Sequence, residues 1–167
     1  IHSYCQNILG QIDARHRQFD VLDDNRLKLY LISRYPQLGI SAFRQRARGG
    51  SYFDAIKQVA NAWKIMNNEL LTTAAIRQHD APLADLLDRL DASLQRDQYI
   101  DFSLMIRKVI EALRRQDLQA LSAVANLQHL MVDEYQDVSP GQEELIRLLH
   151  QRSDTLFVVG DDDQAIY

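Results

Sequence analysis

Two acidic clusters near the end of the chain hold residue types that could do chemistry. They are Asp133–Asp137, with the sequence DEYQD, and Gly160–Gln164, with the sequence GDDDQ. Each follows a short apolar run, 127–132 for the first cluster and 155–159 for the second. Carboxylates at the carboxyl end of a buried strand are where open α/β sheets place their ligand chemistry. An adjacent Asp and Glu there would suit a magnesium-bound nucleotide, because one can hold the metal while the other orients a water.

The loop that usually grips a nucleotide's phosphates is missing from the sequence. That loop is a Gly-rich turn ending in Gly-Lys-Ser/Thr. None of the six glycines here precedes a lysine. We therefore expect the chain to supply part of a nucleotide site and to belong to a longer protein.

Composition places the chain among globular proteins. Hydrophobic residues make up 46% and charged residues 25% of its 167 positions, which argues against disorder. No apolar run approaches the ~20 residues of a membrane span. The single cysteine, Cys5, excludes an internal disulfide and is expected to be a buried apolar side chain. We predict a cytoplasmic protein with no membrane contact.

Helical spacing of apolar residues runs to about residue 125. It predicts a helix over 2–17, one capped by Asp23 or Asp24, one opened by Ser51, one from Pro82 and one from Ile106. Between the second and third of these helices, residues 41–50 read as a loop or a ragged helix end. The tryptophan, Trp63, is expected in the core.

The periodicity changes towards the end of the chain. Residues 127–132 form a continuous apolar run around His129, as expected for a strand covered on both faces, with His129 in the core. Ser139, Pro140 and Gln142 predict a capped helix start. Residues 155–159 predict a second strand. Strand, helix and strand in this order predict parallel pairing.

The segments LMVDEYQDVSPGQEELIRLL and FVVGDDDQAIY resemble the second and third conserved motifs of UvrD/Rep-type superfamily 1 DNA helicases. The segment Ile1–Cys5 resembles the family's Thr-Phe-His-Ser segment, which touches single-stranded DNA. Ile100–Phe102 with Leu104 resembles its Asp-Phe-x-x-Leu segment. The resemblance spans the chain in order and is strongest over 130–167.

The resemblance implies a fold and a division of the chain. The fold class would be α/β, a partial RecA-like P-loop NTPase parallel sheet with a mainly α-helical inserted subdomain. Residues 1–18 would be an edge of the first motor domain, 19–100 the helical insertion, and 101–167 the motor domain with both acidic clusters. The parent protein would be an ATP-dependent helicase moving 3′ to 5′ on single-stranded DNA and opening duplex DNA. The separate fragment is expected to be inactive.

Roles follow from the same resemblance, residue by residue. Asp133 would bind Mg²⁺ and Glu134 would be the catalytic base. Gln164 would sense the γ-phosphate of ATP and couple it to DNA. His2 would contact the DNA backbone, and Tyr167 would stack on bases. Four other positions match the motifs but are given no separate catalytic step: Gln136, Asp137, Asp161 and Asp163. Of these, Asp161 and Asp163 are expected to shape a turn.

The helical segment adds three arginines at alternating positions, Arg44, Arg46 and Arg48, as candidates for contacts with DNA phosphates. A solvated exposed loop explains them equally well.

Two further functions stay open at this point. The acidic clusters could serve a Mg²⁺-dependent nuclease or phosphohydrolase directly. The chain could also be an inert helical module that binds DNA or protein. Protein partners and the biological pathway are not predicted.

Overall fold

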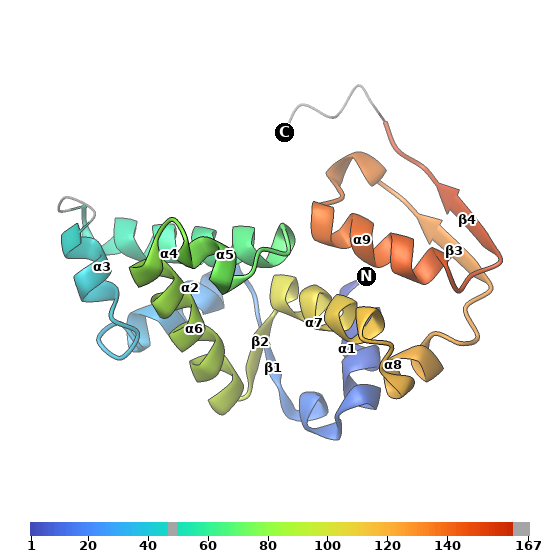
Figure 1. Cartoon of the computed structure of the whole chain (residues 1–167), viewed down its shortest axis with the longest axis horizontal. Coiled ribbons are helices and arrows are strands. Elements are labelled where there is room, and N and C mark those ends of the chain that lie inside the picture. The colour runs from blue at the N-terminus through green and yellow to red at the C-terminus, as the bar shows by residue number, and fades with distance from the viewer. Residues whose placement is uncertain (47–49, 162–167) are drawn as a thin grey trace. The chain divides into compact units, whose positions relative to one another are not determined.

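The computed structural model describes residues 1–46 and 50–161. The chain divides into two compact units, one comprising 18–104 and the other comprising 1–17 together with the residues from 105 onward. Mixed α/β structure is present, mostly helical with two small parallel sheets (Figure 1). No helix in the described ranges is both long enough and apolar enough to cross a membrane.

The unit of residues 18–104 is a group of helices with one short parallel strand pair. Strand β1 (Asp20–Leu22) pairs with β2 (Tyr99–Asp101), so that Leu22 lies beside Asp101. The helices are α2 (Asp24–Ser33), α3 (Ile40–Arg46), α4 (Tyr52–Asn68), α5 (Thr73–Arg77) and α6 (Ala81–Arg96). Residues 41–50, expected to be a loop or a ragged helix end, begin as the end of a helix, because α3 extends to Arg46.

Local caps explain where these helices begin. The Asp23 carboxylate accepts the first N–H groups of α2, as its position predicted. Ser51 and Asp54 form a reciprocal capping box at α4. Trp63 on α4 is fully buried, and the leucines of α6 face the same core.

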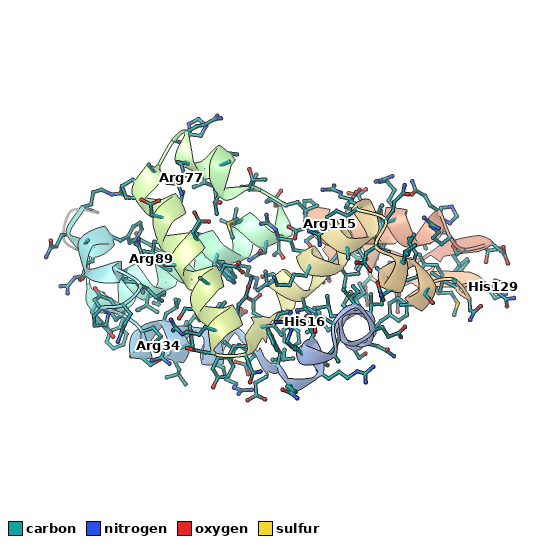
Figure 2. All side chains as sticks on the ribbon, turned by 60° about the horizontal axis from the view of Figure 1, so that its bottom comes forward. His16, Arg34, Arg77, Arg89, Arg115 and His129 are labelled. Carbon is teal, nitrogen blue, oxygen red and sulfur yellow. The ribbon has the colours of Figure 1, made fainter. Side chains whose placement is uncertain are left out.

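Side chains also tie the helices of this unit together. Arg34, which directly follows α2, donates to the Asp97 carboxylate just after α6, at 2.9 Å. Arg89 on α6 donates to the carbonyl of Leu38, at 3.1 Å. Figure 2 labels both arginines.

A buried polar contact joins α4 to the end of β2. Trp63 donates its indole N–H to Asp101, whose side chain is 6% exposed. The same carboxylate accepts the backbone N–H groups of Ser103 and Leu104, at 2.9 and 3.1 Å. Asp101 therefore caps helix α7 (Phe102–Arg114), which begins in this unit and continues into the other.

The other unit holds both acidic clusters. Its first segment is α1 (His2–Ile12), followed by a 3-10 turn (Ala14–Gln18), so the predicted helix over 2–17 ends early. Helix α8 (Leu118–Ala123) packs against α1. Cys5 on α1 is buried, as expected.

Strands β3 (His129–Val132) and β4 (Thr155–Val158) pair in parallel, as the strand–helix–strand pattern predicted. Helix α9 (Pro140–His150) connects them and starts with the predicted box of Ser139 and Gln142. In Figure 1 the two strands lie side by side next to α9.

The expectation that β3 is covered on both faces is wrong for the described residues. Met131 is 78% and Phe157 62% exposed, because the sheet has two strands there and one of its faces is uncovered. His129, expected in the core, is instead exposed and contacts the Thr155 hydroxyl at 2.9 Å. Its place at the start of β3 can be followed in Figure 2.

Candidate active site

The two acidic clusters begin at the same end of the β3–β4 sheet. Val132, the last residue of β3, pairs with Val158, the last residue of β4. Asp133 and Glu134 follow β3 directly, and both side chains are exposed. Because parallel strands end together, the described start of the second cluster lies next to the first. Over the described residues, Asp133, Glu134 and the first residues of the second cluster, Gly160 and Asp161, therefore lie at the same edge of the sheet.

Glu134 has an unusual backbone for a residue with a side chain. Its φ of 53° and ψ of 47° are left-handed, which costs a non-glycine residue about 1–2 kcal/mol. Hydrogen bonds on both sides hold this turn. The Glu134 N–H donates to the Asp133 carboxylate at 3.0 Å, and the Tyr135 N–H donates to the Val159 carbonyl at 3.0 Å. Such strain concentrates at functional sites.

Residues Tyr135–Asp137 form a 3-10 turn that contacts its surroundings on two sides. The Tyr135 hydroxyl donates to Glu143 in the first turn of α9, at 3.2 Å, and this bond raises the pKa of Tyr135. Gln136 donates to the Glu134 carboxylate at 2.6 Å and accepts the Asp161 N–H at 2.9 Å. The turn thus joins the ends of both strands to α9.

The donor set can be compared with the needs of a metal ion. In the described part of the chain, no group of three or more His, Cys, Asp or Glu side chains gathers closely enough to cage a metal. Mg²⁺ rarely requires such a cage, because it keeps several waters and takes one or two carboxylates plus substrate phosphates. An exposed Asp133 at the strand end fits that mode of binding.

The remaining site candidates lie elsewhere or outside the described residues. Gln164, Tyr167 and Arg48, like Asp163, lie outside the described residues. His2 is exposed at the start of α1, in the same unit as Asp133.

Arg44 and Arg46 lie in the last turn of α3, in the helical unit. Arg44 donates to the carbonyl of Gly50 at 2.9 Å, and Arg46 forms an ion pair with Asp80 at 2.8 Å. Both arginines are exposed, so each could exchange its present partner for a phosphate.

Sequence reasoning left Gln136 and Tyr135 without a role, although both belong to the first acidic cluster. Their contacts depend on how the loops after β3 and β4 meet, which spacing along the chain does not reveal. The available signals were the motif match of Gln136 and its position two residues after Glu134.

Comparison with known proteins identifies the family of the chain. The family model described as the UvrD/REP helicase N-terminal domain matches residues 1–167. The "ATP-dependent DNA helicase PcrA" of Staphylococcus aureus strain Mu50 is 29% identical over 177 aligned positions, covering 99% of this chain and 23% of the relative. The protein of the same name from Staphylococcus epidermidis is 29% identical, with the same coverage of both chains. The one from Leuconostoc citreum is 35% identical over 94 residues, covering 56% of this chain and 13% of the relative.

The chain thus spans less than a quarter of the length of these relatives. Its full length, however, matches the family model, and the first acidic cluster lies at the same sheet edge as the described start of the second, Gly160 and Asp161. The chain belongs to the UvrD/REP helicase family, as part of its N-terminal domain.

Proposed function

We propose that the protein containing this chain is an ATP-driven DNA helicase that uses Mg-ATP hydrolysis to move along single-stranded DNA and open duplexes. The observation that carries the proposal is the exposed Asp133–Glu134 pair at the carboxyl end of β3, beside the loop that follows β4. The family match and the PcrA relatives support it.

Asp133 and Glu134 would have different roles in hydrolysis. Asp133 would hold Mg²⁺, and the bound ion would supply positive charge that neutralises the ATP phosphates. Glu134, which follows Asp133 with a left-handed backbone, would orient the attacking water and accept its proton. Gln164 is proposed to sense the γ-phosphate.

The fold of the intact motor is proposed to be RecA-like. Parallel pairing of β3 and β4 supports this, and so does the uncovered apolar face of these strands, because parallel sheets of α/β proteins have both faces covered. We also propose the division into motor segments 1–18 and 101–167 with the helical insertion 19–100, for which the two compact units give support.

DNA contacts are proposed on both units. His2 and Tyr167 would contact single-stranded DNA, and the three arginines Arg44, Arg46 and Arg48 would contact phosphates. The exposure of Arg44 and Arg46 supports that assignment. Movement 3′ to 5′, inactivity of the separate fragment and a cytoplasmic location belong to the same proposal.

A Mg²⁺-dependent nuclease is less well supported. Direct metal catalysis on phosphodiesters usually uses two ions held by several carboxylates. Over residues 1–46 and 50–161, Asp133 and Glu134 have no third ligating side chain close by.

Strand displacement by the intact protein tests the proposal. We expect unwinding of a duplex with a single-stranded 3′ tail that requires both ATP and Mg²⁺. A triple variant with alanine at Arg44, Arg46 and Arg48 should bind DNA more weakly and with a flatter salt dependence. Each phosphate contact that is lost lowers the number of counterions released on binding. Cleavage of DNA with Mg²⁺ and without nucleotide, in place of unwinding, would favour the nuclease instead.

A further inference from the structure

Gln136 uses both ends of its side-chain amide at the site. Its Nε2 donates to Glu134 Oε2 at 2.6 Å, and its Oε1 accepts the backbone N–H of Asp161 at 2.9 Å. A carboxylate can only accept and a backbone N–H can only donate, so the two partners together fix which way the amide points. Gln136 is half-buried, whereas the Glu134 and Asp161 that it joins are exposed.

Gly160 provides the space for this bridge, the pair of hydrogen bonds by which Gln136 joins Glu134 to Asp161. A Cβ at this position would lie 3.0 Å from Gln136 Oε1 and 3.2 Å from Tyr135 Cβ, both tighter than ordinary packing. Its φ lies outside the positive range, so an L-residue could adopt the backbone conformation. Glycine is therefore needed here for close approach of the two loops and not for its conformational freedom.

The two hydrogen bonds of Gln136 connect segments that follow different strands. Glu134 lies at the end of β3, and Asp161 lies in the loop that leaves β4. The remaining contacts of this turn, from Tyr135 to the Val159 carbonyl and from Tyr135 to Glu143, do not touch the Glu134 carboxylate. Of the side-chain hydrogen bonds seen in residues 1–46 and 50–161, the one from Gln136 is the contact that can orient that carboxylate.

We propose that Gln136 is a positioning residue that couples the loop after β4 to the orientation of the Glu134 carboxylate. The inference rests on the proposed function, in which Glu134 orients the attacking water. A shift of the Asp161 backbone moves Gln136 Oε1, and because the amide is rigid it moves Nε2 with it. The position of the Asp161 backbone then sets whether Glu134 points correctly for hydrolysis.

Three variants of the intact protein separate this role from simple support of the turn. Gln136→Met removes both hydrogen bonds at similar volume. Gln136→Glu keeps an acceptor for the Asp161 N–H, but it removes the donor to Glu134 and sets two carboxylates against each other. Gly160→Ala displaces the Gln136 oxygen while leaving its chemistry intact. Gln128→Met, at an exposed glutamine in the same unit, is the matched control.

We expect Gln136→Met and Gln136→Glu to lower kcat for DNA-stimulated ATP hydrolysis roughly ten- to a hundredfold, the effect of losing one hydrogen bond to a charged group. The KM for ATP should change much less, because Gln136 does not hold the phosphates. Hydrogen exchange at the Asp161 amide should speed up in Gln136→Met and Gly160→Ala and stay near wild-type in Gln136→Glu. Gln128→Met should behave as wild-type in all assays.

The inference is overturned if Gln136→Glu keeps the wild-type kcat, or if the variants raise KM without lowering kcat. Exchange at Asp161 that does not change in Gln136→Met would show that the bridge is absent in solution, which also overturns it. A parallel Glu134→Gln variant distinguishes failure of the proposed function from failure of the coupling role of Gln136. If Glu134→Gln retains activity, the proposed function fails and the coupling role fails with it. If Glu134→Gln is inactive and Gln136→Met is fully active, only the coupling role fails.

Discussion

Replacing Asp101 by alanine should destabilise the helical unit strongly. The side chain is 6% exposed, caps α7 through the N–H groups of Ser103 and Leu104, and accepts the indole N–H of Trp63. Loss of a helix cap costs about 0.5–2 kcal/mol. A buried Trp63 N–H left without an acceptor costs about 1–3 kcal/mol more. We therefore expect the free energy of unfolding to fall by roughly 1.5–5 kcal/mol.

Asp101→Asn should cost less. Its amide oxygen can still cap α7, but its NH₂ group then faces the Trp63 N–H, so that two donors meet. We expect only the second contribution, about 1–3 kcal/mol. Urea denaturation followed by tryptophan fluorescence measures both variants, because Trp63 is the single tryptophan of the sequence and reports on the helical unit.

Asp20→Ala is the matched control for these variants. The Asp20 side chain is 72% exposed and lies 3.8 Å from Arg26, so its loss should change stability by about 1 kcal/mol or less. The reasoning is refuted if Asp101→Ala unfolds at the same urea concentration as Asp20→Ala. It is also refuted if Asp101→Asn is as unstable as Asp101→Ala, because the cap would then contribute nothing.

Two further predictions concern α9 and the acid stability of the helical unit. Ser139→Ala removes the cap of α9 and should lower its local stability by about 1 kcal/mol, seen as faster amide exchange in its first turn; unchanged exchange would contradict the capping role. Hydrogen bonds, the largest from Arg96 and the others from Tyr30 and Arg34, lower the pKa of Asp97 in the folded protein. The stabilisation that Asp97 contributes is therefore complete above its unfolded pKa of about 3.9, and it is lost as the pH falls through the folded pKa. Asp97→Asn should therefore flatten the loss of stability below about pH 4, measured as urea midpoints against pH, and an unchanged acid slope would show that other carboxylates dominate.

Local sequence signals predicted much of the fold. Ser51 and Ser139 carry their own capping partners three residues later, so the starts of α4 and α9 could be read from the sequence. The pairing of β1 with β2 could not, because these strands have three residues each and are separated by most of the helical unit. His129 was expected in the core because the apolar run around it gives no sign of which sheet face is covered.

The candidate site was predicted in position but not in detail. Asp133 and Glu134 were expected at the carboxyl end of a strand because apolar runs precede both clusters. The left-handed backbone of Glu134 and the bridge through Gln136 depend on how two loops meet across the sheet. No periodicity or spacing in the chain encodes that meeting.

Hydrolysis by Glu134→Gln and Asp133→Asn variants of the intact protein tests the central claim most directly. Glu134→Gln should bind Mg-ATP about as well as wild-type but hydrolyse it roughly 10²- to 10⁴-fold more slowly, because the amide cannot accept the proton of the attacking water. Asp133→Asn should need more Mg²⁺ for any residual activity, and Glu69→Gln, at an exposed glutamate of the helical unit, should behave as wild-type. Hydrolysis at the wild-type rate by Glu134→Gln would contradict the assignment of this strand-end pair to ATP chemistry.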